Sequence, residues 1–176
     1  MERACFFQHQ SLAEFQDTVA LHIAAINMAL DGIPADQVRL HCCWGNRDGP
    51  HTEDVALDDV LTLLLEAKVG GLCLPFANPR HAHEIELLRT TPLPPEMVLV
   101  TGTIESTSNY VEHPEVVAER IVRAAEALGD RERVIAGVDC GFGTFAGYSL
   151  VADDVVWAKL QALSDGAALA SKRLWS

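Results

Sequence analysis

The sequence predicts an α/β protein that forms half of a (β/α)8 TIM barrel, with four parallel β/α units preceded by one helix. An apolar strand, a polar loop and a helix follow one another four times along the chain, an alternation typical of a parallel sheet. The chain has 176 residues, whereas a complete eight-unit barrel needs at least about 200. The units therefore fit half of a barrel, with a small open sheet as the alternative.

A capping motif marks the first helix, which we expect over residues 12–30. Ser11 is followed three residues later by Glu14, the spacing of a capping box. Apolar side chains then recur at helical spacing until Gly32 and Pro34 interrupt the pattern. The segment is therefore an amphipathic helix with one face available for the core.

Alternating or continuous apolar residues mark the four strands. These are expected over residues 37–43, 69–76, 97–103 and 134–138. Helices are expected over residues 54–68, 114–129 and from Asp153 onward, with a short helix starting near His81. Because no linker or change of composition separates these elements, we expect residues 1–176 to form one domain.

The charge balance excludes several classes of partner. Lysine and arginine number 13 and aspartate and glutamate 25, which gives a formal charge of −12. Nucleic-acid binding and anchoring to anionic membranes both need clustered basic residues, so we expect neither. The first residues lack the apolar run of a signal peptide, and no stretch approaches the roughly 18 apolar residues of a membrane span. We therefore expect a cytoplasmic protein.

The cysteines point to a metal site. Five cysteines and no export signal favour free thiols or metal ligands over disulfides; they are Cys5, Cys42, Cys43, Cys73 and Cys140. His41 and Cys43 share one face of the first strand, and Cys140 follows the fourth strand at the same edge of the sheet. A histidine or cysteine in a strand is more often only structural. Two thiolates and one imidazole that converge, however, suit zinc.

Further polar residues follow the second and third strands. His81, His83 and Glu84 could bind an acidic group of a ligand or cap the short helix. Side-chain to backbone hydrogen bonds that hold loops, or substrate contacts, are expected for Asn78, Arg80 and Asn109. Trp44 could form the wall of a pocket or pack beneath a helix.

Five segments, in order, resemble the carboxyl-terminal catalytic barrel of cobalamin-independent methionine synthase. The resemblance is closest to its short single-barrel relatives, which include the epoxyalkane:coenzyme M transferases. The segments cover residues 41–51, 77–84, 106–114, 139–143 and 157–160. They run over nearly the whole chain and correspond to the second half of the family's barrel.

This resemblance implies a zinc-dependent transfer of a methyl or alkyl group to a thiol, as in methionine biosynthesis. In the family, zinc keeps the substrate thiol as a thiolate, which attacks a methyl group on a reduced folate or an epoxide carbon. The implied zinc ligands are His41, Cys43 and Cys140, and the implied catalytic neighbours are His81, His83 and Asp139. The implied substrates are a homocysteine-like thiol and a methyl-folate-like donor, with coenzyme M as the alternative thiol.

Two departures from the family pattern qualify this expectation. The relatives carry a glutamate ligand at the position of Pro75, and proline cannot bind zinc. Cys73 lies two residues earlier on the same strand face and could replace it, although from about 7 Å deeper along the strand. The family's first four strands are also absent, so we expect a homodimer or a complementing half-barrel to cover the sheet edges. A non-catalytic remnant or interaction module of the family is the second hypothesis.

Overall fold

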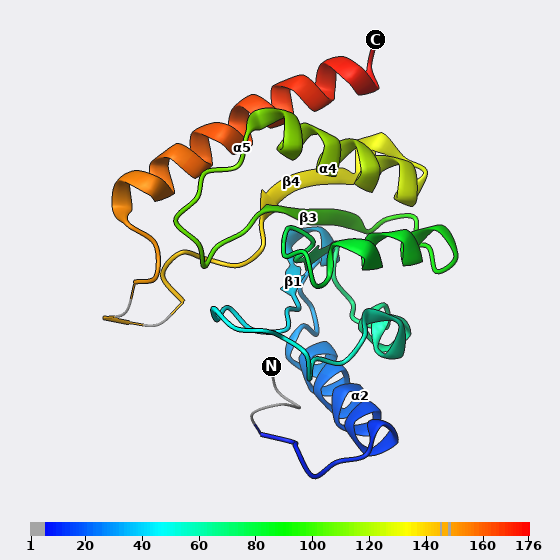
Figure 1. Cartoon of the computed structure of the whole chain (residues 1–176). Coiled ribbons are helices and arrows are strands. Elements are labelled where there is room, and N and C mark those ends of the chain that lie inside the picture. The colour runs from blue at the N-terminus through cyan, green and yellow to red at the C-terminus, as the bar shows by residue number, and fades with distance from the viewer. Residues whose placement is uncertain (1–5, 145, 148) are drawn as a thin grey trace.

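The computed structural model describes residues 6–144, 146–147 and 149–176, so Cys5 lies outside the described residues. Its α-helices are α2 (Leu12–Ala29), α3 (Leu61–Leu64), α4 (Pro114–Leu128) and α5 (Asp153–Leu174). Its strands are β1 (Arg39–His41), β2 (Gly71–Leu74), β3 (Val98–Ile104) and β4 (Val134–Val138). Its 3₁₀ helices are η1 (Ala35–Gln37), η2 (Leu57–Asp59), η3 (Ala82–Arg89) and η4 (Arg131–Arg133). The predicted alternation of strands and helices is confirmed (Figure 1).

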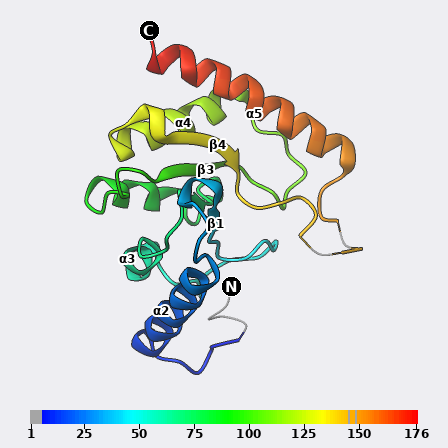
Figure 2. The ribbon, with the colours of Figure 1, turned by 180° about the vertical axis from the view of Figure 1, so that it is seen from behind.

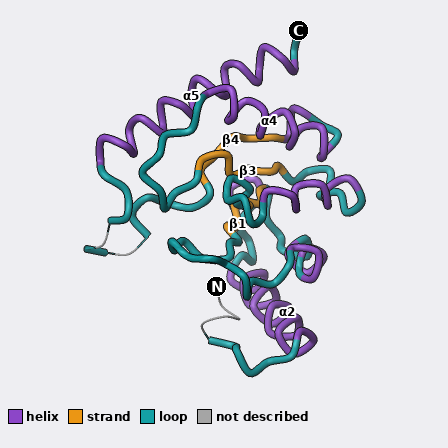
Figure 3. Tube along the Cα trace, viewed as in Figure 1, coloured by secondary structure: helices purple, strands orange, loops and turns teal. Residues whose placement is uncertain are grey.

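The strands form one parallel sheet in the order β1-β2-β3-β4. Leu40 is in register with Leu72, Leu72 with Leu99, and Leu99 with Val134. Sequential order in a parallel sheet means that each helical connection returns the chain to the adjacent strand. The carboxyl ends of all the strands therefore lie at one edge, and the loops that follow β1, β3 and β4 project on the same side (Figure 3).

The helices pack at the two ends of the sheet. Figure 1 shows α5 lying along α4 beside β3 and β4, whereas α2 lies at the opposite end of the molecule beside β1. Figure 2, from behind, shows α3 close to α2. The main core joins sheet residues such as Leu72 and Leu99 to Leu61 of α3 and Phe15 of α2. A second cluster packs Ile104, Val117, Ala118, Ile121 and Ala170 between β3, α4 and α5.

The ends of two helices follow directly from the sequence. The Ser11 side chain accepts the Glu14 amide while the Glu14 carboxylate accepts the Ser11 amide, so the predicted capping box is present at α2. Helix α4 begins with Pro114 and ends at Gly129, which adopts a left-handed conformation (φ 74°) and donates its amide to the Ala125 carbonyl.

The helix predicted over residues 54–68 is wrong over much of its length. Only η2 and the single turn of α3 are helical there. Side chains from elsewhere bind the backbone of this segment, because Trp44 donates its indole N–H to the Val55 carbonyl and Glu84 accepts the Leu57 amide. These contacts hold the entry to the segment in a non-helical conformation.

Strands β1 and β2 are shorter than predicted, and the two edge strands, β1 and β4, are less buried than the central strands β2 and β3. Strand β1 is exposed at Arg39 and His41, and β4 is half-buried at every residue. These two strands form the outer edges of the described sheet, whereas β3 is buried from Thr101 to Ile104.

Within the described ranges, no helix has the length and apolar character needed to cross a bilayer.

Candidate metal centre

The carboxyl edge of the sheet brings together His41, Cys43 and Cys140. The imidazole lies on the last residue of β1, one thiol follows two residues later, and the other follows β4. Their ligand atoms all lie within 4.8 Å of one another. The tetrahedral geometry of zinc places an imidazole nitrogen and a thiolate sulfur about 3.5 Å apart, and His41 Nε2 lies 3.5 Å from Cys140 Sγ. This donor set therefore fits zinc in both its chemistry and its spacing.

Electrostatics favours one thiolate in this group. A hydrogen bond from the Cys140 thiol, assisted by His41 and opposed by burial, lowers the pKa of Cys43 to about 4. The Cys43 thiolate in turn raises the pKa of Cys140 well above its usual range. The hydrogen bond with Cys43 also raises the pKa of His41. The surroundings of Cys43 therefore favour its thiolate, whereas those of Cys140 favour its thiol.

Pro75 stands at the edge of the same site. It directly follows β2 and lines a cavity of about 20 Å³ together with Cys43, Cys140, His51, His81 and Asp139. Cys73 lies opposite His41 in the sheet register, and among the described residues it is not part of the converging group. Burial raises the pKa of its thiol. The residue at position 75 thus faces the site without offering a donor atom.

Asp139 anchors the loop that follows β2. Its buried carboxylate accepts the backbone amides of Ala77 at 2.8 Å and Asn78 at 2.9 Å. Burial raises the pKa of Asp139 to about 6, and these two hydrogen bonds partly oppose that effect. The residue therefore ties the segment beyond β2 to the end of β4, next to Cys140.

Asparagine side chains tie the other loops to one another. The Asn46 side chain donates to the Gly141 carbonyl at 2.7 Å and accepts the Ser106 hydroxyl at 2.8 Å, which joins the loops beyond β1, β3 and β4. Asn109 binds the backbone of Leu150 and Ala152 in the same way. The expected loop-holding role is confirmed for Asn109 and for Asn78, which accepts the amide of Arg80 at 2.9 Å.

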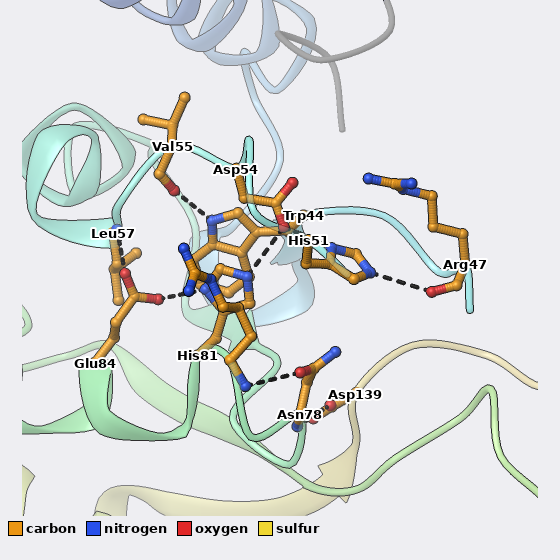
Figure 4. A network of polar contacts seen from close by, with 11 residues as sticks. Trp44, Arg47, His51, Asp54, Val55, Leu57, Asn78, His81, Glu84 and Asp139 are labelled. Carbon is orange, nitrogen blue, oxygen red and sulfur yellow. Dashed lines mark hydrogen bonds and ion pairs between the residues drawn. The ribbon is translucent and has the colours of Figure 1, made fainter. Parts of the chain in front are cut away.

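His81 lies in a network whose extent could not be predicted from sequence spacing (Figure 4). Its ring stacks on Trp44 with 3.8 Å between centroids, and its two nitrogens contact Asp54 and Glu84. The missed partners are Asp54 and His51, which interact with each other at 2.5 Å. His51 lies in the first family-like segment, but the resemblance assigned it no partner.

The remaining candidate, His83, is exposed on η3, two residues beyond His81, and is not among the described residues that line the small cavity. A larger, mostly apolar pocket of about 310 Å³ lies between α2 and β1. It is lined in part by Phe15, Ile23, Leu40, His41, Cys43 and Trp44. A pocket of this size is large enough for a small organic ligand and reaches two of the three candidate metal ligands.

Two curated proteins resemble this chain in sequence. The chain is 26% identical over 169 residues to 2-hydroxypropyl-CoM lyase of Xanthobacter autotrophicus (strain Py2). This alignment covers 82% of this chain and 43% of that protein. It is 27% identical over 148 residues to the uncharacterized protein YxjH of Bacillus subtilis. This alignment covers 83% of this chain and 38% of that protein. The resemblance to the methionine synthase barrel and its single-barrel relatives is confirmed. No family model matches the chain.

The fold of this chain has a solved counterpart. The B12-independent methionine synthase from Shewanella sp. W3-18-1, in complex with selenomethionine, superposes with a TM-score of 0.72 at 22% identity. The match covers 92% of this chain and 46% of that one. The chain therefore has the fold of half of such a barrel, and it spans less than half the length of the relatives that it matches.

Proposed function

We propose that this chain is the zinc-binding half of a barrel enzyme that transfers a methyl or other alkyl group to a thiol. The observation that carries the proposal is the convergence of His41, Cys43 and Cys140 at zinc-ligand spacing. The relatives support it, because one is named for a coenzyme M compound and another for methionine synthesis. Coenzyme M and homocysteine are both thiols, so one chemistry serves both.

The residues of the chain divide the work between metal binding and loop positioning. His41, Cys43 and Cys140 would hold the ion, which when bound would supply the Lewis acidity that keeps a thiol deprotonated at neutral pH. Asp139 fixes the Ala77–Asn78 backbone behind the site. His81, held between Glu84 and Asp54 and stacked on Trp44, lines the small cavity beside the thiols as a fixed polar neighbour.

For the substrates we propose a homocysteine-like thiol and a methyl-folate-like donor. Coenzyme M is the second candidate thiol, favoured by the name of the Xanthobacter relative. The apolar pocket beside His41 and Cys43 offers room for the carbon skeleton of either. Incubating the protein with each thiol and a matching methyl or epoxide donor, followed by mass analysis of the thioether, distinguishes the two.

Zinc content tests the proposal most directly. Protein purified without metal-affinity resin and eluted from a sizing column should carry about one zinc per chain. Cys140→Ser should lower zinc retention strongly, whereas Cys42→Ser, one residue from Cys43 but outside the converging group, should retain it. Zinc near zero in the folded parent chain would overturn the proposal and favour a non-catalytic role.

We also propose that a second copy of the chain completes the barrel, with residues 1–176 acting as one domain. Strands β1 and β4 are the outer edges of the described sheet, and four more β/α units would pair with both. Two copies related by a two-fold axis along the barrel would place β4 of each beside β1 of the other. The large apolar side chains Leu21 and Met28 of α2 and Trp157 of α5 are exposed, at 68%, 79% and 72%.

Light scattering of the eluted protein tests this assembly. A species of twice the 19.1 kDa chain mass is expected. Arg39→Pro removes a backbone donor at the β1 edge and should shift the protein toward monomer, whereas Arg39→Ala, which keeps the backbone donor, should not. A folded, monodisperse monomer of the parent chain would contradict the proposal.

A further inference from the structure

A second cluster of ligand-type side chains lies next to the thiol group. His51, Asp54 and His81 come from two different segments, and their ligand atoms lie within 4.8 Å of one another. Asp54 Oδ2 lies 2.5 Å from His51 Nδ1 and 3.0 Å from His81 Nε2 (Figure 4). All three side chains are buried, with exposures of 3%, 1% and 7%. The two rings therefore converge on a single carboxylate oxygen, away from water.

The outer nitrogen of each ring already has a fixed acceptor. His51 Nε2 lies 3.1 Å from the Arg47 carbonyl, which can only accept a hydrogen bond. His81 Nδ1 lies 2.8 Å from Glu84 Oε2, while the other oxygen of that carboxylate accepts the Leu57 amide. Both outer nitrogens are therefore donors, and in neutral histidines the inner nitrogens present lone pairs toward Asp54.

Positive charge must hold together two ring nitrogens and a carboxylate oxygen that face one another, and either a proton on one ring or a metal ion bound by all three side chains supplies it. Histidines whose outer N–H is fixed by a carboxylate or carbonyl, and whose inner nitrogen is free to bind, are typical of metal ligands in proteins. Asp54 Oδ1 supplies a second observation, because it is buried and has no hydrogen-bond partner among the described residues. A buried carboxylate oxygen without a partner is costly, and coordination to a metal would satisfy it.

We propose that His51, Asp54 and His81 form a second metal site, for a divalent first-row transition ion. Two imidazoles and one carboxylate suit Zn²⁺, Co²⁺ or Fe²⁺, and the absence of a thiolate sets this site apart from the His41, Cys43 and Cys140 group. His51 and His81 line the same small cavity as Cys43 and Cys140, so the two sites adjoin. Trp44, stacked on His81, fixes the orientation of one ligand ring.

Cobalt titration separates the two sites, since a cobalt–thiolate bond gives an intense near-ultraviolet charge-transfer band and nitrogen or oxygen ligands give only weaker visible bands. In the Cys43→Ser/Cys140→Ser chain, we expect uptake of about one Co²⁺ with visible bands alone. His81→Ala in that background should abolish uptake, and Asp54→Asn, which preserves the side-chain volume, should weaken it at least tenfold. His83→Ala, the exposed histidine two residues away, should bind like its parent.

The same proposal can be tested with both thiols in place, in case the double variant does not fold. The unmodified chain should take up two Co²⁺, and His81→Ala should lose one while the thiolate band persists. A folded double-serine chain that takes up no cobalt would overturn the proposal. So would a His81→Ala chain whose stoichiometry matches that of the unmodified chain.

Discussion

The ammonium of Lys159 donates a hydrogen bond to the Glu112 carboxylate at 3.0 Å, and both side chains are buried, with exposures of 0% and 2%. The same ammonium donates to the Glu105 carbonyl at 3.0 Å, while the other oxygen of Glu112 accepts the Glu105 amide at 2.8 Å. The pair therefore holds the backbone of Glu105 from both sides. In this way α5 fixes the loop beyond β3, which borders the candidate metal centre.

Removing only the cation of this pair should be strongly destabilising. Lys159→Met leaves the Glu112 carboxylate buried without a partner, and we expect a loss of about 3–5 kcal/mol in the free energy of unfolding. Glu112→Gln in the same chain should recover part of that loss. Lys172→Met, at an exposed position of the same helix, is the matched control. Urea denaturation gives the comparison, and equal effects at the two lysines would contradict this role for the buried pair.

The close approach at Gly102 should make this position intolerant of any side chain. An added Cβ would lie 2.1 Å from Asp139 Oδ1 and 2.9 Å from Pro75 Cα. Gly102→Ala must therefore displace the carboxylate that holds the Ala77 and Asn78 amides, and we expect a loss of about 1–3 kcal/mol. Gly143→Ala, where an added Cβ meets nothing within 4 Å, should be nearly neutral. Thermal denaturation midpoints of both variants give the comparison. Similar midpoints would contradict a destabilising clash at position 102.

The parts of the fold that local sequence patterns determine were predicted well. The capping box of α2, the proline and glycine at the ends of α4, and strand β4 lie where the spacing of residues places them. The helix over residues 54–68 could not be excluded in advance, because the groups that interrupt it, Trp44 and Glu84, act from other segments. A local pattern carries no information about such long-range hydrogen bonds.

The candidate site likewise has one part that the sequence predicted and one part that it did not. His41, Cys43 and Cys140 could be proposed together because parallel strands end at one edge of a sheet, a rule that needs no detailed geometry. The histidine network could not be predicted, since three residues separate His51 from Asp54 but 27 separate Asp54 from His81. Only the folded path of the chain brings His81, which follows β2, beside His51 and Asp54, which follow β1. The resemblance marked these segments without assigning a partner to either histidine.

Protonation of Glu105 should weaken the fold at low pH. Its carboxylate accepts the amides of Thr107 and Ser108, both at 2.8 Å. Burial alone would raise the pKa of Glu105, but the hydrogen bonds from Ser108 and Thr107 outweigh it and hold the pKa below 4.5. A lowered pKa in the folded state adds stability that is present above the unfolded value and is lost as the pH falls through the folded value.

Glu105→Gln should therefore cost about 1–3 kcal/mol at pH 7, and the difference from the parent chain should narrow as the pH falls below 4.5. Glu119→Gln, at an exposed position of α4, should show little difference at either pH. Denaturant midpoints measured at pH 7 and near pH 3.5 give the comparison. A gap between the parent and Glu105→Gln that widens toward low pH would contradict the sign of this linkage.

Introducing a carboxylate at position 75 should tighten zinc binding. Pro75 lines the cavity shared with Cys43 and Cys140, and its ring offers no donor atom. Outer-shell partners alone change metal affinity by about 10- to 100-fold, so an added ligand in direct contact should lower the zinc Kd at least about tenfold. Pro95→Glu, in an exposed loop, adds the same charge away from the site and should leave the Kd unchanged. Competition with a chelating dye measures both. A Pro75→Glu chain that binds zinc no more tightly than the parent chain would contradict this prediction. That outcome would mean that solvent or substrate completes the site beside the three existing ligands.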